Sequence, residues 1–145
     1  MKKKLVLSLY ISFILLLCVV FIASSFFRVR PIISDPSNIK VIEILQISSS
    51  DGNSKTLLNY DESEIIDCLN GFNMKPTLEK TDVFQTADYK LIITIREGNI
   101  LKQIRLNNEK GYVSEGIDNP QYKLIDAKQL LNNLFEILDL SYESA

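Results

Sequence analysis

The chain has no histidine and no tryptophan, and only two cysteines among its 145 residues. The absence of histidine excludes Ser-His-Asp triads, Cys-His dyads, imidazole zinc sites and histidine-based pH switches. Two cysteines are too few for the disulfide framework that holds many small secreted domains together. P-loops, dinucleotide-binding glycine motifs, C-x-x-C pairs and G-x-S-x-G elbows are also missing. We therefore expect no enzyme, no cofactor and no metal.

Charge is distributed unevenly along the chain. Residues 1–30 contain five basic residues and no acidic residue, whereas residues 31–145 contain 11 basic and 18 acidic residues, a net charge of −7. Nucleic-acid binding requires clustered lysine and arginine, and the acidic part of the sequence has no such cluster. We therefore expect no nucleic-acid partner. With 46% hydrophobic residues, the sequence predicts a folded protein.

The longest uncharged segment, residues 5–27, predicts a transmembrane helix that anchors the chain in the lipid bilayer. As a helix its 23 residues would span about 35 Å, enough for a hydrocarbon core of about 30 Å. The lysines at residues 2–4, with the amino terminus, slightly outnumber Arg28 and Arg30. The positive-inside rule therefore places residues 1–4 in the cytoplasm and the rest of a single-pass protein outside the cell membrane.

Two other interpretations of this segment are open. A cleavable signal peptide has the same charged start, and Ala23-Ser24-Ser25 is the best cleavage pattern. Its apolar core is usually about 7–15 residues long, however, and here the apolar run is longer. A lipoprotein would carry its lipid on Cys18, but leucines precede that cysteine where a lipobox has a small residue. We interpret Cys18 as an apolar residue that faces lipid.

Residues 28–38 predict a stalk, because Pro31 and Pro36 suit neither a helix nor a central strand. The folded domain is then expected over residues 39–142. Its apolar alternation and turn residues predict an antiparallel sheet of about five strands, with a tight turn at Gly98-Asn99. The expected strand segments, of which the last two are short, are residues 39–47, 55–60, 88–96, 100–106, 112–115 and 122–125.

Two amphipathic helices complete the predicted α+β domain. Asp61 and Asp126 are each followed three residues later by Glu or Gln, a pattern that resembles a capping box at a helix start. Gly71 is expected to end the first helix in the left-handed conformation. Cys68 lies in the apolar stripe of that helix, which favours a small core residue over a reactive thiol. The second stripe consists of Ala127, Leu130, Leu131, Leu134, Phe135, Ile137 and Leu138.

Three weak motifs have simpler structural explanations. An acidic cluster could bind calcium, but acids in a first helical turn also favour the helix dipole. Its members are Asp61, Glu62, Glu64 and Asp67. Residues 51–54 offer oxygen ligands without the spacing of a calcium loop, and predict a turn. Residues 37–40 match S-x-x-K, but no S-D-N or K-T-G accompanies them and no helix begins there, so we interpret the match as chance.

The segment 112–122 is the best candidate for a binding site, because tyrosine, acidic and amide side chains surround a loop that contains glycine and proline. Loops on a rigid sheet often bind ligands. Tyrosines that cover a small core would give the same pattern, so both interpretations are open. The candidate residues are Tyr112, Glu115, Asp118, Asn119 and Tyr122, with Pro120 and Gln121 between them.

Three segments of the sequence, taken with the order of predicted elements, carry a resemblance. They are Ile65-Ile66-Asp67-Cys68-Leu69-Asn70, Lys75-Pro76-Thr77 and Asn119-Pro120-Gln121-Tyr122-Lys123-Leu124. In these features the chain resembles a group of small exported proteins of uncharacterised function in Gram-positive bacteria. Many of those proteins are membrane-anchored or lipoproteins, so the resemblance implies an envelope location and no known activity. In that group the last piece tends to read Pro-Tyr with a second tyrosine soon after, whereas this chain has Pro120-Gln121-Tyr122.

The sequence leaves three hypotheses for function. We expect a non-enzymatic domain outside the membrane that binds an envelope component, a peptide or a neighbouring membrane protein. The alternative is a secreted or anchored immunity or inhibitor protein, whose acidic surface would bind a basic partner by charge complementarity. The third is a hydrolase that uses carboxylates alone, which requires two acids in one cleft.

Overall fold

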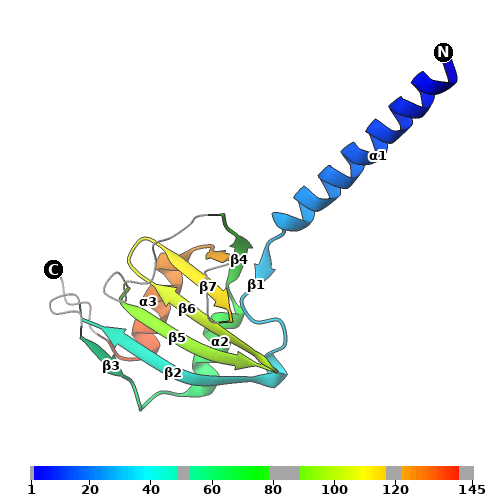
Figure 1. Ribbon diagram of the computed structural model, residues 1–145. Helices are drawn as coiled ribbons and strands as arrows, with labels where there is room; N and C mark the ends of the chain where they lie inside the picture. Colours follow the sequence, from blue (N-terminus) through cyan, green and yellow to red (C-terminus); the bar gives the residue numbers. More distant parts are fainter. Residues whose placement is uncertain (1, 49–52, 79–88, 117–121, 141–145) are drawn as a thin grey trace.

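The computed structural model describes residues 2–48, 53–78, 89–116 and 122–140. A long N-terminal helix leads into an α+β domain, in which two helices cover one side of an antiparallel sheet (Figure 1). The predicted fold class, an apolar helix followed by an α+β domain with an antiparallel sheet, is therefore confirmed.

The N-terminal helix α1 (Lys2–Phe26) extends away from the domain (Figure 1). Its segment Val6–Ser25 is 20 residues long, is apolar enough to cross a membrane, and has none of its length buried inside the protein. Phe13, Leu16 and Phe21 are among its many exposed large side chains. A helix that is apolar on all sides and lacks a protein neighbour is typical of a segment surrounded by lipid.

The sheet has eight strands, so the prediction of about five was too low. All neighbouring strands are antiparallel, in the order β1-β4-β8-β7-β6-β5-β2-β3. The strands are β1 (Arg30–Pro31), β2 (Ile39–Ile47), β3 (Ser54–Thr56), β4 (Asn73–Pro76), β5 (Leu91–Glu97), β6 (Ile100–Leu106), β7 (Gly111–Glu115) and β8 (Tyr122–Leu124). The strands β1 and β4 were not expected, because each ends in proline. β1 is an edge strand, and Pro76 is the last residue of β4. A missing amide donor costs little at either position.

The central hairpin of β5 and β6 follows the predicted alternation. The apolar residues Leu91, Ile93 and Ile95 lie on the face that the helices cover and belong to the main core. The predicted turn is present between the two strands, and Gly98 adopts a φ of +58° there. That left-handed conformation costs glycine little, because it has no Cβ to clash with the following carbonyl.

Helices α2 (Glu62–Asn70) and α3 (Ala127–Ile137) pack against the same face of the sheet (Figure 1). The predicted cap of α2 is confirmed, because Asp61 Oδ1 accepts a hydrogen bond from the Ser63 amide at 2.8 Å. Cys68 is half-buried against the main core, and burial raises the pKa of its thiol, as for a core residue rather than a reactive one.

Two predicted helix ends are wrong. Gly71 has a φ of −77° rather than a left-handed conformation, because the chain leaves α2 in a right-handed turn and enters β4 two residues later. Asp126 makes no side-chain capping bond to α3. It has a φ of +56°, because the chain must reverse between Leu124 and Ala127 within two residues.

The segment after α1 belongs to the domain, so the predicted stalk and the domain start at residue 39 need correction. Only residues 27–29 separate α1 from β1, and β1 pairs with β4. Ile32 and Ile33 are then 0% and 2% exposed in the main core. A short 3-10 helix (Pro36–Asn38) leads from there into β2. Burial of the two isoleucines removes apolar surface from water and stabilises the packing of this segment against the domain. The prediction of a stalk considered only the neighbouring prolines.

Candidate functional site

The structure places the predicted loop residues in different surroundings. Tyr112 is 3% exposed in a small apolar cluster on the outer face of the sheet, which we define as the face opposite α2 and α3. By strand register, Glu115 and Tyr122 lie instead on the face that the helices cover. Asp118 and Asn119 lie outside the described residues. Ligand binding by this loop therefore stays a prediction.

Tyr122 contacts β1, the strand that follows α1. Arg30 Nη1 donates a hydrogen bond to the phenolic oxygen of Tyr122 at 3.3 Å, and its guanidinium carbon lies 5.8 Å from the centre of the ring. An arginine over an aromatic ring gains a cation–π attraction. This contact joins β1 to β8 across the intervening strand β4.

A buried charged group, which we call the Lys102 cluster, lies at the end of the sheet where the chain arrives from α1. It consists of Lys102, Glu97, Glu115 and the backbone of residues 32–35. Lys102 Nζ is 2.5 Å from Glu97 Oε2 and 3.4 Å from Glu115 Oε1, and it donates a hydrogen bond to the Ile32 carbonyl at 2.9 Å. Lys102 is only 2% exposed and Glu97 8%. A lysine so buried is charged only where partners replace the lost water.

The second oxygen of Glu97 binds the same incoming segment. Glu97 Oε1 accepts hydrogen bonds from the amides of Ser34 at 2.6 Å and Asp35 at 2.5 Å. Burial by itself raises the pKa of Glu97, but the hydrogen bonds and charge of Lys102, with the two amides, outweigh burial and lower that pKa below its ordinary value. The carboxylate is therefore ionised at neutral pH and ties residues 32–35 to β5 and β6.

Glu97 and Glu115 bring two carboxylates to one place, which a carboxylate hydrolase would also require. Here both carboxylates face the Lys102 ammonium, and Glu97 is buried against the backbone of residues 34 and 35. A general acid needs a raised pKa, whereas the pKa of Glu97 is lowered. The arrangement suits attachment of a chain segment better than proton transfer.

Sequence reasoning missed the Lys102 cluster, although one signal was available. Lys102 and Glu97 occupy inward positions in the alternation of β6 and β5, in line with Ile104 and Ile95. A charged residue at an inward position needs a buried partner. The identity of that partner depends on strand register and on residues 32–35. These residues are far away in the sequence, since Ile32 and Lys102 are 70 positions apart.

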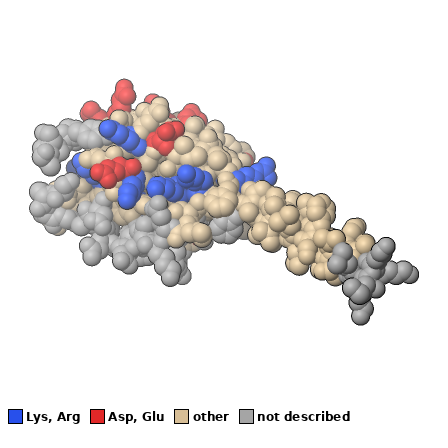
Figure 2. Space-filling model, turned by 90° about the horizontal axis from the view of Figure 1, so that it is seen from above, with Lys and Arg blue, Asp and Glu red and all other residues tan. Residues whose placement is uncertain are grey.

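The outer face gathers basic residues that are scattered in the sequence. Strand register aligns Arg105 of β6 with Tyr112, Tyr112 with Lys123, and Lys123 with Lys75. A second row pairs Lys40 with Arg96. Figure 2, a view from above the domain of Figure 1, shows lysine and arginine side chains spread across the surface, with acidic side chains both among them and along one margin. We found no basic cluster in the sequence because these residues come from five different strands.

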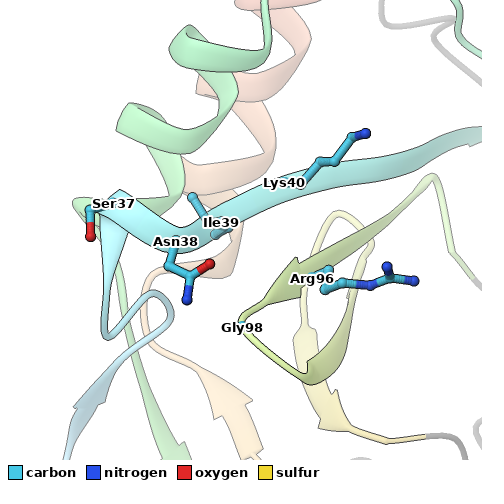
Figure 3. Close-up of a pocket in the computed structure, with 6 residues that line it drawn as sticks. All are labelled: Ser37, Asn38, Ile39, Lys40, Arg96 and Gly98. Atoms are coloured by element: carbon cyan, nitrogen blue, oxygen red, sulfur yellow. The ribbon is translucent and has the colours of Figure 1, made fainter.

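A shallow hollow of about 180 Å³ lies where β2 begins beside the β5–β6 turn. It is lined by Ser37, Asn38, Ile39, Lys40, Arg96 and Gly98 (Figure 3). Ser37 and Lys40 of the S-x-x-K match both line it, but their side chains point in different directions (Figure 3), and Ser37 Oγ donates to Asp35 Oδ1 at 2.6 Å. The serine therefore has no lysine base beside it, in agreement with a chance match.

Two of the four acidic residues near the start of α2, Asp61 and Glu62, have local structural contacts. Asp61 caps the helix, and a hydrogen bond from the Ser63 side chain, followed by backbone amides, lowers the pKa of Asp61. Glu62 Oε1 accepts from the Val41 amide at 2.6 Å on the neighbouring strand β2. Within the four described ranges, no group of three or more acidic or cysteine residues is arranged to hold a metal ion.

Comparison of the chain with protein families, with curated proteins and with solved structures found no match.

Proposed function

We propose that this chain is a single-pass membrane protein that holds its α+β domain at the outer surface of the cell membrane and binds an envelope component, a peptide or a neighbouring membrane protein without catalysis. One observation carries the proposal. The apolar segment Val6–Ser25 is uncovered by protein and is joined to a well-packed domain by residues 27–29 alone. An apolar helix of that length with no protein around it is typical of a segment that lies in lipid.

The attachment of the domain supports a role close to the membrane surface. Residues 30 and 31 pair with β4, and residues 32 and 33 are buried in the core. The backbone of residues 32, 34 and 35 is hydrogen-bonded to Lys102 and Glu97. The domain therefore cannot move far from the bilayer on a flexible tether, and partners must approach it at the membrane. Three lysines at residues 2–4 precede the apolar segment, and two arginines, Arg28 and Arg30, follow it. The larger positive charge before the segment favours a cytoplasmic amino terminus and an external domain.

Protease treatment of intact protoplasts tests membrane attachment and sidedness together. A chain with a C-terminal tag should remain in the membrane fraction at full length and should lose its tag to external protease. A shortened chain in the medium would identify a cleaved signal peptide, and a protected tag would place the domain inside the cell. Leu16→Arg should reduce membrane insertion, because a central charge costs about 3 kcal/mol, whereas Leu16→Met should not.

Cross-linking from the outside of the same protoplasts tests binding. The full-length protein should form cross-links to a specific envelope component or membrane protein. A domain that yields no cross-linked partner at any position on its surface would contradict the binding role while leaving the topology intact.

A further inference from the structure

Lys40 and Arg96 form an unusual pair on the outer face. They are directly opposite each other on β2 and β5, and both are exposed. Like charges at opposite positions of an antiparallel pair destabilise a sheet. Neither side chain has a carboxylate within ion-pair distance in the described part of the chain. Two cations are thus held side by side without the counter-charge that Lys102 has on the other face.

The surroundings of this pair form a site for an anion. Lys40 and Arg96 line the shallow hollow of about 180 Å³ with Asn38 and Gly98, and none of its lining residues is acidic. Figure 3 shows that Lys40 and Arg96 leave neighbouring strands with their charged ends pointing in different directions, while the Asn38 amide points toward Gly98. Lysine provides three N–H donors and arginine five, neither has an acceptor, and the Asn38 side chain adds two N–H donors. The donors that line the hollow therefore suit a negatively charged ligand with several oxygen acceptors.

We propose that this hollow binds the phosphate ester group of an anionic envelope component. Arginine recognises phosphate oxygens in a bidentate arrangement, and lysine adds a point charge. The site neutralises the repulsion between Lys40 and Arg96 only when the anion is bound. This inference gives a ligand class to the proposed binding function and depends on that function only for its location outside the membrane.

Nuclear magnetic resonance of the labelled full-length chain in uncharged maltoside micelles tests the site directly. Glycerol 3-phosphate should shift the amide signals of Asn38, Arg96 and Gly98 in a saturable way, and the apparent affinity should fall with added salt. Lys40→Gln and Arg96→Gln should each weaken the apparent affinity about fivefold, as expected for a charge interaction at an exposed site. Lys128→Gln, which removes an exposed charge on α3, should leave that affinity unchanged.

Replacing the micelles with lipid nanodiscs identifies the source of the phosphate. Nanodiscs of phosphatidylglycerol with phosphatidylcholine should cause the same shifts, relative to phosphatidylcholine alone, if the ligand is a lipid headgroup. Shifts with free glycerol phosphate alone would identify a soluble or polymeric ester instead. Absence of saturable shifts with both probes, or an equal loss of affinity in Lys128→Gln, would overturn the site. Because purified protein is used, either result is independent of the protoplast experiment.

Discussion

The two faces of the sheet treat basic residues in opposite ways. On the face that the helices cover, Lys102 is 2% exposed and contacts two carboxylates and a carbonyl. On the outer face, Lys40 and Arg96 are exposed, and no carboxylate in the described ranges lies within ion-pair distance of them. The comparison teaches that strand register, rather than residue type, decides whether a cation holds the fold together or stays available for a ligand.

The largest expected difference between the faces comes from removing one charge on each. Lys102→Met keeps the aliphatic length but leaves Glu97 buried without a counter-charge, so the free energy of unfolding should fall by about 3–5 kcal/mol. The matched variant Lys40→Met should change it by less than about 0.5 kcal/mol. Urea unfolding of the full chain in maltoside micelles, followed by the near-ultraviolet circular dichroism of the tyrosines, measures both. Equal effects would mean that the Lys102 cluster does not hold the segment.

A second test enlarges a glycine on the covered face. A Cβ at Gly111 would lie 2.9 Å from Ala127 Cβ and 2.6 Å from Leu124 Cδ1, so Gly111→Ala should cost about 1–3 kcal/mol in the same unfolding experiment. Gly71→Ala is the matched control, because its nearest contact would be an ordinary 3.5 Å and its φ is negative. That variant should be neutral or slightly stabilising. An equally tolerated Gly111→Ala would contradict the close packing of β7 against α3.

Acid should weaken the covered face selectively. The folded pKa of Glu97 lies below its ordinary value of 4.5, so its carboxylate stabilises the fold above that pH, and the contribution is lost as the pH falls through the folded pKa. Unfolding measured from pH 7 down to pH 3 should show this loss in the natural chain. Glu97→Gln should be less stable at pH 7 and should show a shallower decline on acidification.

Asp61 is the second group with a lowered pKa, and it contributes to acid destabilisation in the same direction. Asp61→Asn therefore provides the control for the acid experiment. Glu97→Gln should make the amides of Ser34 and Asp35 exchange faster with solvent at pH 7, because both amides donate to Glu97, whereas Asp61→Asn should not. Equal exchange rates in the two variants would contradict a role for Glu97 in holding residues 34 and 35.

The smallest expected effect is a gain on the outer face. Lys40→Glu would place opposite charges on the cross-strand pair with Arg96, and should stabilise the domain by about 0.2–1 kcal/mol. Lys55→Glu is the control, because Lys55 is opposite the uncharged Gln46. A gain in both variants would mean that the pair with Arg96 is not its source, and a loss in Lys40→Glu would show that the two cations do not repel each other.

Much of the fold could be predicted from local patterns. The uncharged run that forms α1 and the alternation of β5 and β6 depend only on neighbouring residues, and the structure contains both. Asp61 caps α2 as its position predicted. Strands β1 and β4 were missed because Pro31 and Pro76 argue against strands locally, and only the finished sheet shows that each proline lies where a lost amide is tolerated.

The candidate sites required knowledge of register. Tyr112 and Tyr122 are close in sequence, but their strands place them on opposite faces. Lys40 and Arg96 are distant in sequence and lie side by side. A shift by one residue in either pairing would exchange the faces. Residue spacing therefore marks Lys102 and Glu97 as inward-facing, but it cannot identify their partners or the residues that line the hollow.

The position of residues 30–35 has a consequence for the order in which the protein folds. These residues follow α1 directly, yet their partners lie in β4, β5 and β6, which are synthesised later. Ile32 and Ile33 therefore remain uncovered until those strands are available to pack against them. A chain interrupted before β6 would leave both isoleucines exposed and the Ile32 carbonyl without Lys102.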